Sequence, residues 1–220
     1  MDLVSVVIPY FKKKEYIGKC IQSVLRQSYK YFEIIVIYDD QDYSDLDYLK
    51  KIVRQDKRIH LVLNRKNLGA GLSRNRGIKM SRGKFIAFLD ADDYWDKNKL
   101  KFQIAKCIKD KIDVLFTNFK AFNEKKKIIY SVKPPSSLNF NDLIKACPVC
   151  CSSVIILKKC FKKRLFKKLK TKEDYDLWLN LSKAGYKIQC LDRYLTYYKV
   201  RTNSLSSLHF NKFQNAFLIY

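Results

Sequence analysis

Three aspartates at the end of an apolar run are the residues whose types and spacing most directly suggest chemistry. Residues 85–95 read Phe-Ile-Ala-Phe-Leu-Asp-Ala-Asp-Asp-Tyr-Trp, so Asp90, Asp92 and Asp93 crowd the end of a strand-like segment. Mutual repulsion makes such a cluster costly unless a cation or fixed donors compensate it. Hard oxygen ligands suit Mg²⁺ or Mn²⁺, usually held by one or two carboxylates plus substrate phosphates. The segment predicts a metal site, and the alternative is an acidic turn that caps the next helix.

The elements that would position these acids alternate in type along the first half of the chain. Buried strands are predicted at four segments: 4–9, 32–38, 59–63 and 85–89. Apolar stripes between them predict helices at residues 16–25, 46–53 and 70–80. Strands separated by helices predict a parallel sheet with right-handed crossovers, whose ligand site lies beyond the carboxyl ends of the strands. Asp39 and Asp90 both follow such ends.

The second half of the chain has a different pattern, which predicts a mixed rather than parallel sheet. Helices are expected at residues 99–108 and 174–184, and strands at 114–122, 128–132, 152–157, 187–191 and 195–200. No internal repeat or interdomain linker interrupts the chain. We therefore expect a single α/β domain with a Rossmann-like, mostly parallel sheet and a mixed second half.

The composition fits a globular chain with anionic partners. The 220 residues include 45 basic and 21 acidic side chains, a formal net charge of +24, and the field of such a chain favours nucleic acid, an anionic membrane face or phosphorylated substrates. Residues 161–168 interleave Phe and Leu with cations, which is typical of an interfacial segment or of a solvated helix face. No apolar run reaches the roughly 18 residues that span a bilayer, and no signal-peptide pattern is present, so we expect a cytoplasmic protein.

Six segments, taken in order, resemble the family 2 glycosyltransferases, inverting enzymes with the GT-A fold that build bacterial surface polysaccharides such as lipopolysaccharide or capsule. They are 4–10 (VSVVIPY), 32–40 (FEIIVIYDD), 67–69 (NLG), 73–78 (SRNRGI), 88–93 (FLDADD) and 173–178 (EDYDLW). The resemblance covers nearly the whole chain. It implies one GT-A domain over residues 1–220, with a nucleotide-sugar-binding half at about 1–96 and an acceptor-binding and catalytic half at about 97–220.

The resemblance also implies the reaction, which is transfer of a hexosyl or N-acetylhexosaminyl group from a nucleotide diphosphate to an acceptor hydroxyl, with inversion at the anomeric carbon. A nucleotide diphosphate leaves poorly until its charge is neutralised, and a divalent cation bridging both phosphates does that. Asp92 is the predicted ligand of Mn²⁺ or Mg²⁺. Asp90 resembles the first acid of the DxD motif of the family, which contacts the ribose and the metal shell.

The remaining donor contacts are expected at the ends of the first strands. Asp39 resembles the acid that binds the base, usually uracil, and a carboxylate suits the imide donor. The family pattern Asp-Asp-Gly-Ser is here Asp-Asp-Gln-Asp, so Asp40 is the alternative. Arg74 could reach the base or the diphosphate with its planar fork of donors. Pro9 and Tyr10 end the first strand where the base should lie, and Tyr10 either stacks on the base or belongs to the core.

Inverting transfer needs one base to remove the acceptor proton, and Asp174 is the predicted catalytic base. The alternative for Asp174 is an acid placed at a helix start for capping and dipole reasons. Glu173 could position the acceptor or a loop. Arg201 stands where many relatives carry a His that completes the metal shell; an Arg cannot ligate the cation but could hold the diphosphate.

Three functions are compatible with the sequence. The first is a sugar transferase that uses a nucleotide-sugar donor, with UDP as the expected nucleotide, and a glycan or lipid-linked acceptor, in peripheral contact with the inner face of the cell membrane. The second is a basic nucleic-acid-binding protein, but strand-end acids oppose a phosphate groove and no nucleic acid is expected as a partner. The third is a nucleotidyltransferase, which would need a glycine-rich loop after the first strand, where residues 10–13 read Tyr-Phe-Lys-Lys.

Overall fold

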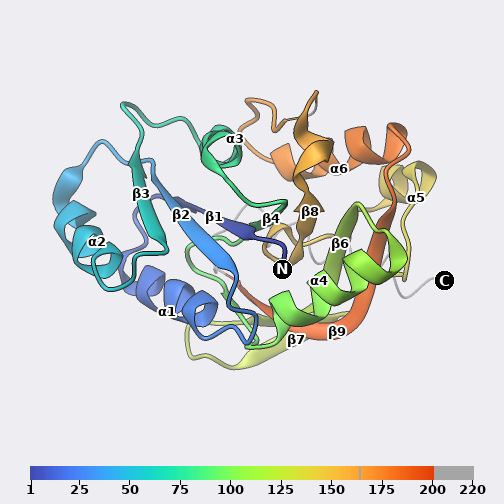
Figure 1. The fold of residues 1–220 in the computed structure, drawn as a ribbon, viewed down its shortest axis with the longest axis horizontal. Helices are drawn as coiled ribbons and strands as arrows, with labels where there is room; N and C mark the ends of the chain where they lie inside the picture. Colours follow the sequence, from blue (N-terminus) through green and yellow to red (C-terminus); the bar gives the residue numbers. More distant parts are fainter. Residues whose placement is uncertain (164, 201–220) are drawn as a thin grey trace.

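One continuous sheet runs through both halves of the chain in the computed structural model, which describes residues 1–163 and 165–200 (Figure 1). Its first half is parallel, as predicted, and consists of four apolar strands: β1 (Val4–Tyr10), β2 (Phe32–Tyr38), β3 (Ile59–Leu63) and β4 (Phe85–Phe88). They lie in the order β3-β2-β1-β4. The carboxyl ends of β1, β2 and β4 therefore share one edge, where Asp39 and Asp90 follow their strands.

Helices cover both faces of this sheet because successive strand residues point to opposite sides. On one face Val4, Val6 and Ile8 of β1 form a core with α1 (Lys14–Leu25), α2 (Leu46–Val53) and α4 (Lys99–Asp110). On the other face Val7 packs in a second core with α3 (Ala70–Met80) and α6 (Glu173–Lys183). Figure 1 shows the two layers on opposite sides of the strands.

The second half extends the sheet with mixed pairing, which confirms the predicted change of pattern. Its strands are β5 (Tyr94–Trp95), β6 (Val114–Phe122), β7 (Ile128–Val132), β8 (Ile155–Leu157) and β9 (Ile188–Lys199). Strand β8 joins the two halves by pairing antiparallel with both β4 and β6, whereas β9 is parallel to β6. The short helix α5 (Phe140–Lys145) and the 3-10 turns η1 (Tyr43–Asp45), η2 (Cys151–Ser153) and η3 (Lys158–Phe161) complete the described elements.

The structure corrects several of the predicted elements. The expected strand 152–157 begins with the 3-10 turn η2, and only its last three residues pair in the sheet. The two strands expected at 187–191 and 195–200 are one strand, β9, whose register against β6 shifts beside Asn118 and so accommodates the polar residues between them. Strand β5 was not predicted, because two residues are too short for a periodic signal.

Membrane-spanning helices are not found in the described part of the chain, where no helix combines sufficient length with sufficient apolar character.

Helix α3 approaches β1 closely because Gly77 has no side chain. A Cβ at Gly77 would lie 2.3 Å from Val7 Cγ1 and 2.9 Å from Val7 Cγ2.

We expect Gly77→Ala to lower the free energy of unfolding by about 1–3 kcal/mol, since overpacking exceeds the gain in helix propensity. The measurement is urea unfolding, with Gly18→Ala in α1 as the control. The nearest atom to a Cβ at Gly18 is the mobile Tyr48 hydroxyl at 3.1 Å, so Gly18→Ala should cause no loss. An equal loss in both variants would contradict the close-approach argument.

Candidate active site

A pocket of about 1180 Å³ opens at the carboxyl ends of β1, β2 and β4. One wall comes from the first half of the chain and contains Pro9, Asp39, Arg74, Asp90 and Asp92. The opposite wall comes from the end of α5, the loop before α6 and the first turn of α6, where Glu173 and Asp174 lie. The fold thus brings most of the predicted site residues to one cavity, although they are spread over more than 160 positions of the chain.

Asp39 organises the loop that leads into α3. Its Oδ1 accepts hydrogen bonds from Asn64 Nδ2 at 2.7 Å and from the Leu68 amide at 2.8 Å, and its Oδ2 accepts one from the Gly69 amide at 2.8 Å. A carboxylate has about four acceptor positions, so one position on Oδ2 is left for a ligand. Asp40 is also buried, but it does not line the pocket, and its Oδ1 accepts from the Asp42 amide. The geometry favours Asp39 as the base contact.

Tyr10 lies in the core and also lines the pocket, so stacking on the base stays a prediction. Its ring is fully buried and stacks on Tyr38 with the ring centroids 5.4 Å apart, and its hydroxyl donates to Asp45 Oδ2 at 2.6 Å. Burial, reinforced by Asp45, raises the pKa of Tyr10 far above its ordinary value. The Tyr10 phenol is therefore neutral, and Pro9 is the more accessible of the two residues at the end of β1.

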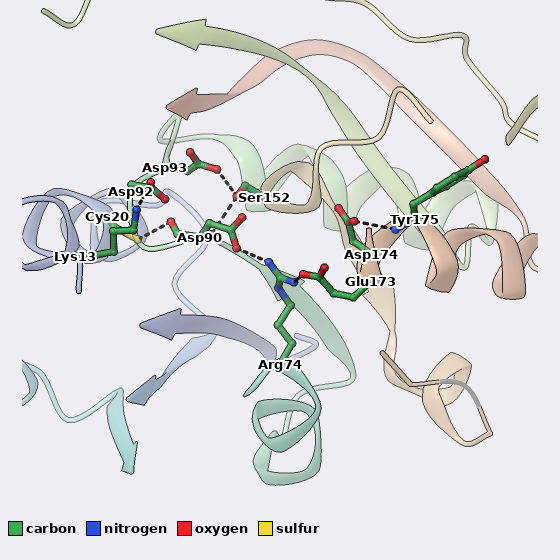
Figure 2. A network of polar contacts seen from close by, with 10 residues as sticks. All are labelled: Lys13, Cys20, Arg74, Asp90, Asp92, Asp93, Ser152, Glu173, Asp174 and Tyr175. Atoms are coloured by element: carbon green, nitrogen blue, oxygen red, sulfur yellow. Dashed lines mark hydrogen bonds and ion pairs between the residues drawn. The ribbon is translucent and has the colours of Figure 1, made fainter. Parts of the chain in front are cut away.

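A buried guanidinium connects the two walls of the pocket (Figure 2). Arg74 Nη2 donates to Asp90 Oδ1 at 2.6 Å, and Arg74 Nη1 donates to Glu173 Oε1 at 2.9 Å. The Arg74 side chain is only 4% exposed. Arg74 therefore links the strand-end acid Asp90 to the start of α6, while its predicted contact with the base or the diphosphate stays a prediction. Its Nε is buried without a hydrogen-bond partner among the described residues.

Asp92 lies beside Lys13, a residue for which the sequence predicted no role. Lys13 Nζ contacts Asp92 Oδ2 at 2.9 Å, and both side chains are largely buried. Burial, together with the nearby charge of Asp90, raises the pKa of Asp92 to about 6. An additional positive charge at this position would be stabilised by both carboxylates.

Asp93 has a structural position and does not cap the next helix, because the residue at the start of α4 is Asn98. The buried Asp93 carboxyl accepts from Ser152 Oγ at 2.5 Å and from the Lys199 amide at 2.8 Å. Ser152 Oγ also lies 3.0 Å from the Asp90 amide, so η2 is fastened to both ends of the acidic segment. Burial, followed by the charges of Asp92 and Asp90, raises the pKa of Asp93 well above its usual range.

Asp174 stands in the first turn of α6 and lines the pocket. Among the described residues, its Oδ1 accepts a hydrogen bond from the neighbouring Tyr175 amide at 2.8 Å. Burial is the main cause that raises the pKa of Asp174 to about 6, and Arg74 opposes the shift. A carboxyl with this pKa is largely ionised at neutral pH and still accepts a proton readily, which is what a general base requires.

Comparison with known proteins identifies the family. The family model described as Glycosyl transferase family 2 matches residues 5–170. The chain belongs to glycosyl transferase family 2. It is a glycosyltransferase, as the sequence motifs indicated, and family membership supports this function over the two alternatives considered from the sequence.

Two relatives of this glycosyltransferase carry the name of the same reaction. The chain is 35% identical over 215 residues to the UDP-Glc:alpha-D-GlcNAc-diphosphoundecaprenol beta-1,3-glucosyltransferase WfaP of Escherichia coli. The match covers 97% of this chain and 82% of WfaP. It is 34% identical over 212 residues to WfgD of Escherichia coli, named for the same reaction, with 96% of this chain and 81% of WfgD covered.

Solved structures show the same fold. The crystal structure of S. aureus TarS in complex with UDP-GlcNAc superposes with a TM-score of 0.75 at 22% identity. The match covers 94% of this chain and 61% of the TarS chain, so this glycosyltransferase spans less than two thirds of the TarS protein crystallised. The GT-A-type architecture expected from the sequence is confirmed.

The donor set at the acidic segment fits a divalent cation. Asp90 and Asp92 present hard carboxylate oxygens, and Mg²⁺ and Mn²⁺ are bound in nucleotide sites by one or two carboxylates plus phosphate oxygens. In the part of the chain described, no three His, Cys, Asp or Glu side chains group around one point. A cation at this glycosyltransferase site would therefore be held by Asp90 and Asp92 together with the diphosphate of the donor.

Three residues of the site, Lys13, Ser152 and Asn75, were not predicted from the sequence. Lys13 and Ser152 contact the acidic segment but carry no motif, since a lysine run and a lone serine are common on surfaces. Asn75 lies within the SRNRGI motif, yet its contact with the loop before α6 needs the tertiary structure to be seen. Arg201 lies outside the described residues.

The raised pKa of Asp174 predicts how stability varies with pH. The folded protein holds a proton on Asp174 up to about pH 6, whereas the unfolded chain loses it near 3.8. Between these values the native state binds more protons, so the Asp174 contribution to stability falls as pH rises. Asp174→Asn removes this dependence. We expect the stability of the variant relative to wild type to increase from pH 4 to pH 6 and then level off, as measured by urea unfolding with EDTA. A constant difference would show that the Asp174 pKa is not raised.

Proposed function

We propose that the chain transfers a sugar from a UDP donor to a hydroxyl of a lipid-linked glycan, with inversion at the anomeric carbon and with Mn²⁺ or Mg²⁺ as cofactor. The observation that carries this proposal is one pocket that holds Asp90 and Asp92 on one wall and Asp174 on the other, joined through Arg74 and Glu173. The names of WfaP and WfgD support a UDP-sugar donor and an acceptor with GlcNAc attached to a polyprenyl diphosphate.

Each residue has a separate role in the proposed reaction. Asp39 accepts a hydrogen bond from the base with its remaining oxygen position, next to Pro9 at the end of β1. Asp92 and Asp90 would hold the cation, which would neutralise charge on the departing diphosphate when bound. Asp174 takes the proton of the acceptor hydroxyl as the oxygen attacks the face of the sugar opposite the leaving group. Arg74 keeps these two centres aligned.

The place of action that we propose is the cytoplasmic face of a membrane, with peripheral contact. A formal net charge of +24 favours anionic surfaces, and the named acceptors of WfaP and WfgD are lipid-linked.

Binding of UDP tests the donor site. We expect calorimetry to detect UDP binding with Mn²⁺, and EDTA or Asp92→Asn to weaken it about tenfold or more, because the carboxylate that holds the cation is lost. The control is Asp47→Asn on α2, where the side chain is 88% exposed and the change in net charge is the same. UDP binding that is indifferent to Mn²⁺ and to Asp92 would refute the metal assignment and leave general anion attraction as the cause.

Kinetics of Asp174→Asn test the catalytic base. We expect kcat to fall about a hundredfold or more with unchanged UDP affinity, since general-base catalysis typically contributes factors of 10² to 10⁴. The wild-type rate should rise with pH through about 6, where Asp174 loses its proton. Asp176→Asn is the control, because Asp176 pairs with Lys167 outside the pocket lining. Equal loss in the two variants would reject the base, and product with retained anomeric configuration would reject inversion.

A further inference from the structure

Three lysines stand on the wall of the pocket opposite the acidic segment. Lys145 ends α5, and Lys170 and Lys172 lie in the loop before α6. All three are exposed and line the pocket, and within residues 1–163 and 165–200 none of them forms an ion pair. The fourth lysine of the lining, Lys13, differs because it pairs with Asp92. Three lysine ammonium groups on one wall favour a multiply charged anion in the pocket.

The loop that carries two of these lysines is held at both ends by α3. Asn75 Nδ2 donates to the Phe166 carbonyl at 2.8 Å, and the Phe166 amide donates to Asn75 Oδ1 at 3.0 Å. At the other end Arg74 holds Glu173. Gly71 permits the close approach, since a Cβ there would lie 2.9 Å from Glu173 Cγ and 3.2 Å from the carbonyl oxygen of the loop residue Lys167. Lys170 and Lys172 are thus placed by fixed anchors.

Lys145 is also placed by a specific contact. Tyr175 Oη in α6 donates to the Leu143 carbonyl of α5 at 2.7 Å, which ties the helix ending at Lys145 to the start of α6. The two helices lie side by side in Figure 1. Lys172 has φ 62° and ψ 23°, a left-handed conformation that costs a non-glycine residue free energy.

We infer that Lys145, Lys170 and Lys172 bind the diphosphate of a prenyl-diphosphate-linked acceptor. This inference rests on the proposed function. The diphosphate of the donor belongs at Asp90 and Asp92, so an acceptor that carries its own diphosphate needs a second cationic site beyond Asp174. Lysine ammonium groups serve as compact point charges for phosphate and require no metal.

Exposed apolar side chains beside the lysines match the prenyl chain of such an acceptor. Ile144, next to Lys145, is 55% exposed, and Leu169, next to Lys170, is 46% exposed. Cations interleaved with exposed apolar side chains are typical of surfaces that contact lipid. A ligand with a diphosphate joined to an isoprenoid chain would use both features, whereas a free phosphate would use only the lysines.

Direct binding tests the inference without turnover. The probe is farnesyl diphosphate, titrated into the 220-residue protein with EDTA present so that metal at Asp90 and Asp92 does not contribute. The triple variant Lys145→Gln, Lys170→Gln, Lys172→Gln should bind at least about tenfold more weakly than wild type, because three charge interactions are lost. The control is Lys57→Gln, Lys79→Gln, Lys109→Gln, which removes three charges from exposed positions outside the pocket lining and should bind as wild type does.

A second variant and a second ligand sharpen the test. Lys145→Gln with Lys170→Gln leaves the start of α6 unaltered and should still weaken farnesyl diphosphate binding severalfold. Inorganic pyrophosphate should bind more weakly than farnesyl diphosphate. Equal affinity for the two ligands would overturn the lipid part of the inference, and equal losses in the pocket and control triple variants would overturn the lysine site in favour of general charge attraction.

Kinetics separate this site from the proposed reaction. Two acceptors with the same terminal GlcNAc are compared, one linked through a diphosphate to a short prenyl chain and one linked directly to an alkyl chain. The pocket triple variant should lose about tenfold or more in kcat/KM for the first acceptor only, with unchanged UDP affinity. Equal loss for both acceptors, or weaker UDP binding, would overturn the inference while leaving the sugar transfer intact. Absence of transfer to either acceptor by wild type, with farnesyl diphosphate binding still dependent on the lysines, would refute the proposed function alone.

Discussion

The active site depends on one buried cation, the guanidinium of Arg74. Asp90 follows a strand of the parallel half, and Glu173 begins a helix of the mixed half, so nothing in the local backbone brings these two carboxylates together. Arg74 contacts both of them from α3 and compensates charges that would otherwise repel. Buried ion networks contribute little net stability, since desolvation offsets attraction, but they impose a defined arrangement. Here the arrangement sets the separation between the acidic segment and Asp174.

The acidic segment and the lysines occupy different parts of the pocket lining. Acids gather at the carboxyl ends of β2 and β4, and burial, followed by the charge of Asp90, raises the pKa of Asp92 to about 6. Lysines that form no ion pair with any described residue stand on the wall formed by α5 and the loop before α6. In the proposed reaction, both the donor and the acceptor carry a diphosphate. A metal cation on carboxylates would hold the donor diphosphate, and lysine ammonium groups would hold the acceptor diphosphate. The close contacts of Gly71 and Asn75 hold that loop against α3.

Much of the site could be predicted from the sequence because its residues sit at element ends with strong local patterns. The apolar runs of β2 and β3 and the stripe of α3 coincide with the observed bounds, and the strand-end rule placed Asp39 and Asp90 at one sheet edge. The role of Tyr10 and the position of Asp93 were not decided in this way. Both residues are buried by partners distant in sequence, Asp45 and Tyr38 in one case and Ser152 in the other.

The sequence by itself determined the alternation of strands and helices in the parallel half, the order of the motifs and hence the family. These features depend on hydrophobic periodicity and on residues close together in the chain. Only the tertiary structure decided that β8 joins the two halves, that Lys13 lies on Asp92, and that Lys145, Lys170 and Lys172 line the pocket that contains Asp174. Lysines and short strands have no periodic signal of their own, and their neighbours are set by packing between segments far apart in sequence.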